Sequence, residues 1–450
     1  MTVFKSSRTG HHRTYAGLRM LAVLAAKNLT RYRRRTLITV SAIAFGVAIF
    51  IGMASMLDGL IAEGDRNLVR YETASAAITG TGYWDEREQY PLDITVADVD
   101  AVVSALEDGD IAAAPRVGFR GELIVHYDPY PEDGSVHLNM YGIDPERDAR
   151  VFHLADALIE GQFLDPGEHG ILISAWLAER LGAEVGYPVT ITTRTRDGFH
   201  QILDMDIVGI YETPNPTVDR SAIYMPLDIA DFYLEMRGAV TAIHLALPEP
   251  VPGAADLQPV RAALERAGVN LTESPAAGDG GPQSSAIELL SFDEMTAEFA
   301  AAMELQDAAF AVVLLLLGVI AVVGISNTML MAVLEREREI GMMRALGMRN
   351  GEIRSMFVFE SAGIGLIGAA IGLLLGAALV WYLTAHGIDY SAVLADVEMD
   401  FRFDGVLYGV WSPRTMITAA VGAAVLAGAV ALLPVRRILR RGISDSLRQH

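Results

Sequence analysis

The chain has 450 residues and a net charge of −21, and residues 59–307 carry 44 acidic side chains against 14 arginines and no lysine. An acidic block of this size argues against nucleic acid as a partner, because phosphates are bound by clusters of Lys and Arg. The absence of cysteine excludes disulfides, cysteine nucleophiles and thiolate metal sites, so an extracytoplasmic domain here must be stable through its core alone.

Residues 1–35 are predicted to be a cytoplasmic segment. After a polar, basic start, apolar residues recur at helical spacing ahead of the arginine-rich residues 31–35, which is typical of an amphipathic helix at a membrane interface. Residues 36–58 are predicted to be the first transmembrane helix, because residues 37–57 carry no charge. The basic leader is too long for a cleaved signal peptide and favours an uncleaved anchor.

Residues 59–307 are predicted to form an extracytoplasmic α+β domain with a mixed or antiparallel sheet and a stalk helix at each end. Short apolar or alternating runs between Gly, Pro and Asp are typical of strands. The predicted strands cover residues 74–79, 121–126, 136–141, 170–174, 189–194, 205–210, 221–225 and 240–247. The predicted helices cover residues 96–106, 176–181, 226–236 and 257–267.

Two features close this block. Residues 272–286 are rich in Gly, Pro and Ser, which predicts a linker or mobile loop. Ser291 and Glu294 have the spacing of a capping box, which predicts the start of a stalk helix. Because no helix breaker follows, we expect this helix to run into the second span, residues 308–334.

Three transmembrane helices are predicted after this block, at residues 308–334, 361–385 and 413–435. Each is long enough to cross about 30 Å at about 1.5 Å per residue. They are separated by a charged loop at residues 335–360 and by a short acidic loop at residues 386–412. A basic tail, residues 436–450, follows the last span.

Arginines decide the predicted orientation. They lie beside the spans at residues 31–35, 336–354 and 436–448, whereas the alternate flanks are acidic or neutral. The positive-inside rule therefore places both termini and residues 335–360 in the cytoplasm and the acidic domain outside. The sequence predicts a multi-pass inner-membrane protein of four transmembrane helices, with a large mixed-sheet α/β domain between the first two.

No catalytic, cofactor or metal site is predicted. Neither Lys5 nor Lys27, the two lysines present, follows a glycine-rich loop, so the Walker A motif is missing and we expect ATP hydrolysis in a partner subunit. The sequence also has no HExxH and no GxSxG motif. The apolar cores of the predicted spans hold no ionisable residue, which argues against an ion channel or an ion-coupled carrier.

Small residues follow one face of the third predicted span. Gly368, Gly372 and Gly376 form a GxxxGxxxG pattern, and alanines recur at every fourth position of the last span from Ala419 to Ala431. Such faces let two helix backbones approach closely. Packing within one chain and packing between two chains are both consistent with the pattern.

The loop at residues 335–360 is predicted to be a helical hairpin. Ile340, Met343 and Leu346 share an apolar edge of its first helix, and Gly347 is placed to end that helix in the left-handed conformation. Asn350 is placed to cap a second helix that continues into the third span. We therefore expect an apolar edge that a cytoplasmic partner can bind.

The stretch EREREIGMMRALGMRNGEIRSMFVFES resembles the cytoplasmic loop of FtsX-like ABC transporter permeases, which has an E-R-x-x-E-I-G core followed by A-x-G. The residues that match this pattern are Arg336, Glu339, Ile340, Gly341, Ala345, Gly347 and Glu360. NLTRYRRRTLITVSAIAFGVAIFIGM resembles the first span of the family. EGQFLDPGEHGILISAWLAERLGAEVGYPVTI is similar to the outer domain of its lipoprotein-releasing and macrolide-exporting members.

This resemblance implies a mechanism and partners. Such permeases pair with a second permease, identical or paralogous, and with ATPase subunits whose closure moves the outer domains by mechanotransmission. The resemblance assigns the first helix of the hairpin to ATPase coupling, with the expected coupling residues Arg336, Glu339, Ile340, Gly341, Arg344, Ala345, Leu346 and Gly347.

Three functions are compatible with this resemblance. The first hypothesis is release of lipoproteins from the outer leaflet of the inner membrane, in contact with membrane lipid. The alternatives are efflux of an amphiphilic drug or peptide, and transmembrane signalling to a cell-wall hydrolase without transport.

Overall fold

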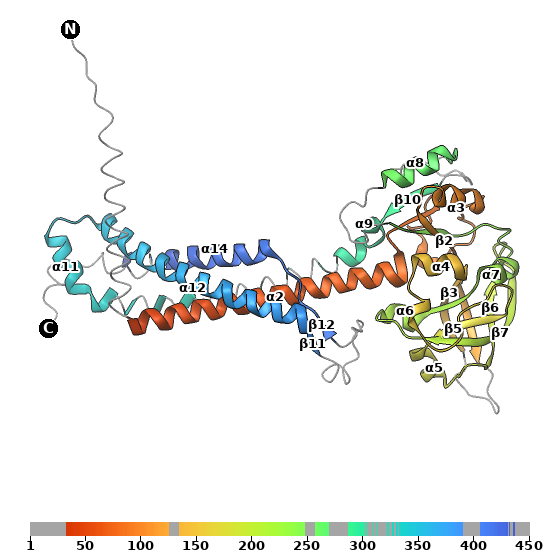
Figure 1. Ribbon diagram of the computed structural model, residues 1–450, viewed down its shortest axis with the longest axis horizontal. Coiled ribbons are helices and arrows are strands. Elements are labelled where there is room, and N and C mark those ends of the chain that lie inside the picture. The colour runs from red at the N-terminus through yellow and green to blue at the C-terminus, as the bar shows by residue number, and fades with distance from the viewer. Residues whose placement is uncertain are drawn as a thin grey trace, which may run out of the picture. The chain divides into compact units, whose positions relative to one another are not determined.

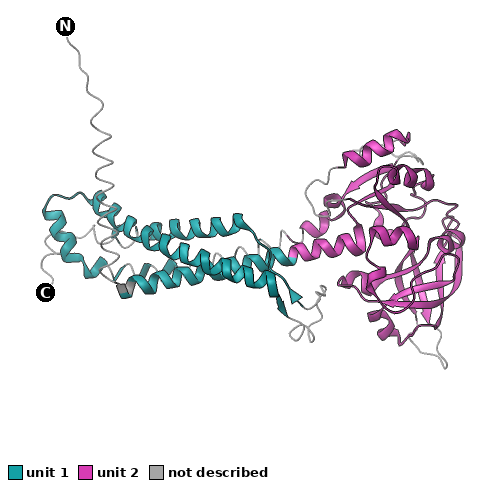
Figure 2. Cartoon of the chain, viewed as in Figure 1, with its two compact units in different colours: residues 1–60, 304–389, 406–450 teal, residues 61–303, 390–405 magenta. Residues whose placement is uncertain are grey.

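The protein is described by a computed structural model. The described residues are 33–125, 135–247, 257–269, 287–301, 303, 308, 312, 322–323, 326–327, 330–331, 333–389, 406–430, 432 and 435–436. The chain divides into two compact units, shown in Figure 2. Unit 1 comprises residues 1–60, 304–389 and 406–450, and unit 2 comprises residues 61–303 and 390–405.

Unit 1 is helical. Its long helices are α2 (Arg33–Leu68), whose last residues belong to unit 2, α12 (Asn350–His386) and α14 (Pro413–Val430). Figure 1 shows these helices running alongside one another. Among the described residues, three helical segments are long and apolar enough to cross a membrane, namely Thr36–Thr73, Asn350–His386 and Pro413–Val430.

Several predicted segments lie outside the described residues. They are residues 1–32, most of the predicted second span at 308–334, residues 390–405 of the acidic loop, and most of the basic tail. The residues of the third predicted span lie within the helix α12, which starts in the charged loop and continues without interruption. The smaller elements of unit 1 are α11 (Glu337–Ala345), β11 (Ile388–Asp389) and β12 (Val406–Leu407).

Unit 2 is built on a mixed sheet. Within its described residues the strand order is β10-β1-β9-β2-β3-β8-β5-β7-β4, and β6 pairs with β2 and β7. Two pairs, β3 with β8 and β5 with β7, are parallel. The strands are β1 (Ala76–Gly80), β2 (Ala112–Val125), β3 (Ser135–Ile143), β4 (Leu158–Gly161), β5 (Gly170–Ser174), β6 (Pro188–Arg194), β7 (His200–Tyr211), β8 (Ala222–Pro226), β9 (Ala242–Ala246) and β10 (Ile287–Ser291).

Short helices connect these strands. They are η1 (Val69–Thr73), η2 (Arg87–Gln89), α3 (Val99–Glu107), α4 (Pro145–Val151), η3 (Ala155–Ala157), α5 (Ala175–Leu181), α6 (Pro216–Ser221), α7 (Leu227–Leu234), α8 (Gln258–Arg266) and α9 (Phe292–Met295).

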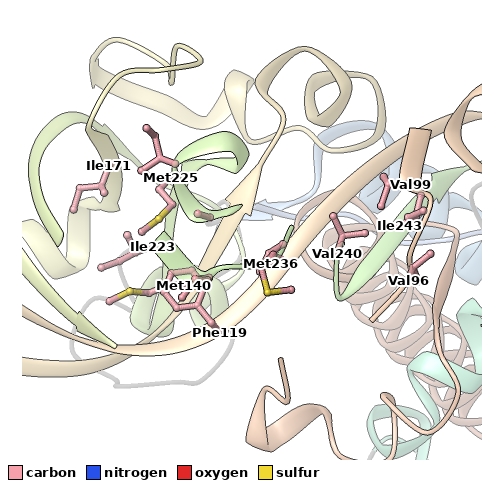
Figure 3. Close-up of a cluster of buried hydrophobic side chains, with 14 of the residues drawn as sticks. Val96, Val99, Phe119, Met140, Ile171, Ile223, Met225, Met236, Val240 and Ile243 are labelled. Carbon is pink, nitrogen blue, oxygen red and sulfur yellow. The ribbon is translucent and has the colours of Figure 1, made fainter. Parts of the chain in front are cut away.

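The core of unit 2 follows the alternation of its strands. On β7, Leu203, Met205 and Ile207 are buried while the residues between them are exposed, because successive side chains of a strand point to opposite faces. Figure 3 shows side chains of the main cluster, among them Phe119 of β2 and Met140 of β3. The five residues of β8 are all buried, as is usual for strands in the parallel part of a sheet.

The mixed sheet and the eight predicted strands are confirmed, with ends that shift by a few residues, but the sequence analysis missed several elements. β4 was missed because three of its four residues are exposed and show no alternation. The missed helices α4 and α6 each carry a proline in the first turn after an Asp or Asn cap, a local signal that was available. The first half of β2 and the whole of β10 were also not predicted.

The capping box of Ser291 and Glu294 is confirmed. Ser291 Oγ accepts a hydrogen bond from Glu294 N at 3.3 Å, and Glu294 Oε2 accepts one from Ser291 N at 2.8 Å. The expectation of an unbroken helix from this point was wrong, because α9 ends at Met295 and Thr296 leaves helical geometry before the helix resumes at residues 297–301. The Thr296 hydroxyl donates to Phe292 O at 2.8 Å, and such side-chain bonds compete with the helical backbone. The predicted linker at residues 272–286 lies outside the described residues.

Candidate functional site

The loop between the apolar segments of unit 1 is a helical hairpin made of α11 and the first turns of α12. The turn after α11 is a Schellman motif, in which Gly347 N donates to Arg344 O at 3.1 Å and Met348 N donates to Met343 O at 3.0 Å. Gly347 has a φ of +94°, so the predicted left-handed glycine is confirmed. These bonds fix the point at which the chain reverses.

The start of α12 differs from the prediction. Asn350 is the first helical residue, and Arg349 occupies the cap position with an extended backbone. Glu352 Oε2 accepts the Arg349 backbone N–H at 2.8 Å. The predicted Asn350 cap was therefore wrong by one position, because the carboxylate of Glu352 reaches back to the residue before the helix.

A buried ion pair joins the two ends of the hairpin. Arg336 Nη1 lies 3.0 Å from Glu360 Oε2, and both side chains are almost completely buried. A small apolar cluster surrounds the hairpin, made of Val333, Ile340, Ile353, Met356, Phe357 and Val435 with Met343 and Met348 at its margin. The hairpin therefore has a core of its own.

The expected coupling residues divide into three groups by burial. Arg336, Ile340 and Gly341 are buried and serve the packing of the hairpin. Glu339 and Arg344 are half-buried. The exposed members are Ala345, Leu346 and Gly347, with Leu346 88% exposed.

The predicted apolar edge needs correction. Ile340 lies inside the hairpin because it packs against α12, whereas Met342, which the sequence analysis left out, is 49% exposed beside Leu346. A partner can thus reach Met342, Ala345 and Leu346 directly. The role of Glu360 as the partner of Arg336 was also missed, because the two residues are 24 positions apart.

The glycine stripe of α12 faces α2 of the same chain. A Cβ placed on Gly368 would lie 2.8 Å from Ile43 Cβ, and one on Gly372 would lie 2.7 Å from Ala44 O. A Cβ on Gly376 would lie 2.9 Å from Ile51 Cδ1. In the described part of unit 1 these glycines permit close contact between two helices of one chain.

The alanine face of α14 also packs against α12. A Cβ on Gly365 of α12 would lie 2.6 Å from Ala427 Cβ, and Ala419 and Ala423 pack against the same cluster. Ala431 lies outside the described residues.

Unit 2 contains a buried ion pair that the sequence analysis did not identify. Arg116 Nε lies 2.8 Å from Asp148 Oδ1 and ties β2 to α4. The guanidinium carbon of Arg116 lies 3.3 Å from the ring centroid of Phe152. Burial raises the pKa of Asp148, while the neighbouring Arg116 acts in the opposite direction. Within the described residues no group of three or more His, Cys, Asp or Glu side chains is arranged to hold a metal ion.

Two family models match the chain. The MacB-like periplasmic core domain matches residues 36–267, and the FtsX-like permease C-terminal domain matches residues 311–443. The chain belongs to the FtsX-like permeases with a MacB-like periplasmic core. It is thus a permease of the ABC transporter type, with apolar helices and a periplasmic domain of mixed sheet.

Relatives of this FtsX-like permease include proteins of several organisms. The lipoprotein-releasing system transmembrane protein LolC of Neisseria meningitidis serogroup B is 26% identical over 77% of this chain and 77% of that protein. The ABC transporter permease YtrF of Bacillus subtilis is 33% identical over 29% of this chain and 30% of that protein. The macrolide export ATP-binding/permease protein MacB of Chlorobaculum tepidum is 37% identical over 20% of this chain and 15% of that protein.

Among solved structures, the periplasmic region of MacB from Actinobacillus actinomycetemcomitans matches the permease with a TM-score of 0.34 and 12% identity, over 51% of this chain and 94% of that one.

Proposed function

We propose that this permease is the membrane subunit that converts ATP hydrolysis in a separate ATPase into movement of unit 2 outside the membrane. The observation that carries the proposal is the α11–α12 hairpin, which has its own buried ion pair and core yet exposes Leu346 almost fully. A loop that only connects two helices needs neither a core of its own nor an exposed apolar side chain. A docking site needs both, because it must keep its shape while a partner pushes on it.

The proposal includes a topology and partners. We place both termini and the hairpin in the cytoplasm, count four transmembrane helices with residues 308–334 as the second, and assign a second permease, identical or paralogous, to the complex. The distribution of arginines supports this orientation. ATP binding then shifts a two-state equilibrium through contacts with the hairpin that differ between the two states.

We propose release of lipoproteins from the outer leaflet of the inner membrane as the activity. The similarity to a lipoprotein-releasing protein supports this choice, because it extends over 77% of both chains. Efflux of an amphiphilic drug or peptide is the second candidate. It is favoured by the match of residues 36–267 to the periplasmic core domain of the macrolide-exporter type.

Reconstitution tests the proposal. The permease, co-purified with its ATPase, is placed in proteoliposomes that carry a triacylated protein and a fluorescent amphiphile. We expect ATP-dependent appearance of the lipidated protein in the soluble fraction when a soluble lipid-binding acceptor is present. The same protein without its acyl chains serves as the control for release.

Two results would contradict this activity. ATP-dependent loss of the amphiphile alone would favour efflux. ATP hydrolysis that moves neither substrate would favour signalling without transport.

A further inference from the structure

The outer end of α2 has an unusual backbone. The α-helix ends at Leu68 and the chain continues as a π-helical turn, η1, before Ala74. Ala74 is buried and has φ 59° and ψ −166°, a combination that essentially only glycine adopts. An alanine keeps this conformation only where the surrounding structure holds it.

Three hydrogen bonds hold η1 from three different elements of unit 2. His153 N, after α4, donates to Arg70 O at 3.0 Å. Asn215 Nδ2, at the start of α6, donates to Glu72 Oε2 at 3.1 Å. His244 Nδ1, on β9, lies 3.0 Å from Thr73 O.

Two of these side chains have no freedom to turn. Asn215 Oδ1 accepts Thr217 N at 3.0 Å, so its amide uses the oxygen for α6 and the nitrogen for Glu72. A carbonyl oxygen only accepts, so the ring of His244 must be protonated on Nδ1. The ring also packs edge-on against Phe152 at 5.3 Å between centroids.

Contacts at residues 70, 72 and 73 fix rotation as well as position. The three partners come from three separate parts of unit 2, namely the residue after α4, the start of α6 and strand β9, so η1 is held at three points by groups that do not move independently of the sheet. A helix end held at one point can swivel, whereas an end held in this way turns together with the domain.

We propose that η1 is a rigid joint that passes rotation of α2 to the sheet of unit 2, with Asn215 and His244 as its positioning residues. This inference rests on the mechanotransmission proposed above. It adds that η1 is the part of the periplasmic domain through which movement of α2 is transmitted to the sheet.

One substitution, Asn215→Asp, removes the hydrogen bond to Glu72 and keeps the cap of α6. Asn215→Asp keeps an oxygen for Thr217 N but sets a second carboxylate against Glu72. Glu72→Gln in the same chain restores a donor, because the amide of the glutamine bonds to the new carboxylate. Glu63→Gln is the matched control, because Glu63 pairs with Arg66 inside α2 and not with the sheet.

The distance between two spin labels, one on α2 and one on the domain, measures how rigidly η1 holds the helix against the domain. The chain has no cysteine, so Ala62→Cys on α2 and Glu179→Cys on α5 can be labelled specifically in the full-length permease, which leaves the Glu63–Arg66 pair of the control intact. We expect one narrow distance distribution in the parent and in Glu63→Gln, a broad one in Asn215→Asp, and a narrow one again in the double variant. Glu72→Ala, which removes the acceptor of the Asn215 amide, is expected to broaden it too.

The measurement is made first on the permease alone and then on its complex with the ATPase, with and without ATP. If the distance distributions of Asn215→Asp and Glu72→Ala are as narrow as that of the parent, the proposal of a rigid joint is wrong. It is also wrong if the distribution of the double variant stays broad. Failure of the proposed function is a different result, in which the joint variants behave as expected but ATP moves no label in the parent. If both proposals hold, ATP shifts the distance from unit 2 to a label on unit 1 in the parent, and this shift is lost in Asn215→Asp.

Discussion

Arg336 Nη1 and Glu360 Oε2 lie 3.0 Å apart in the interior of the α11–α12 hairpin, with 3% and 2% of the two residues exposed. A buried ion pair adds little net stability, but removing one partner leaves an unpaired charge in an apolar place. The pair therefore makes the position of α11 relative to α12 depend on both residues.

Removal of one partner should damage the hairpin more than removal of both. We expect Glu360→Ala to cost about 3–5 kcal/mol of unfolding free energy, and Arg336→Met with Glu360→Leu to recover most of it. Denaturant unfolding of the purified permease measures this difference. Arg338→Ala, on the exposed side of α11, should change stability by less than about 0.5 kcal/mol. A double variant as unstable as Glu360→Ala would contradict the ion-pair account.

Contact with the ATPase should depend on Leu346. Leu346→Glu places a charge on a side chain that is 88% exposed, so we expect co-purification with the ATPase to be lost while thermal stability is retained. Phe232→Glu is the control, because Phe232 is 74% exposed on α7 of unit 2. Retained co-purification of Leu346→Glu would refute docking at this edge. Gly341 is unsuitable for this test, since it is buried and a bulky residue there would disturb the hairpin itself.

Two glycines of the apolar helices should respond oppositely to the same exchange. A Cβ on Gly372 would lie 2.7 Å from Val47 Cβ, so Gly372→Ala should separate α12 from α2 and cost about 1–3 kcal/mol. Gly422 of α14 has nothing within 4 Å, so Gly422→Ala should be neutral or stabilise by about 0.5–1 kcal/mol. Thermal unfolding in detergent compares the stability of the two variants with that of the parent. Equal effects would show that α2 and α12 do not pack through this stripe.

Acid should loosen β9 through His244. Burial, and next the charge of Arg116, lower the pKa of His244 to about 3 from 6.5. The unfolded chain therefore binds a proton at a higher pH than the folded one, so the contribution of this residue is complete above pH 6.5 and is lost progressively as the pH falls towards about 3.

Hydrogen exchange of the β9 amides in the full chain measures this loss. Protection should decline between pH 6.5 and 4 after correction for intrinsic exchange, and His244→Gln should flatten the decline because glutamine does not titrate in this range. His200→Gln, at an exposed position on β7, is the control. A decline that is the same in His244→Gln and in the parent would assign the pH dependence to other groups.

The elements that sequence analysis placed well depend on neighbours in the chain. The alternation of β7, the apolar stretch of α12, the capping box of Ser291 and the left-handed Gly347 each follow from residues a few positions apart. The EREREIG stretch likewise indicates the family through a short run of adjacent residues. The types of these segments and the existence of the helical hairpin could thus be predicted from local sequence alone.

Tertiary structure decided which residues meet. Only packing shows that Arg336 pairs with Glu360, that Ile340 turns inward while Met342 faces out, and that the glycine stripe lies on α2. The same holds for Ala74, whose backbone conformation depends on hydrogen bonds from residues far along the chain. The physical reason is that a helical period specifies a face but not its partner, and the partner is chosen by the burial of side chains brought together from distant parts of the sequence.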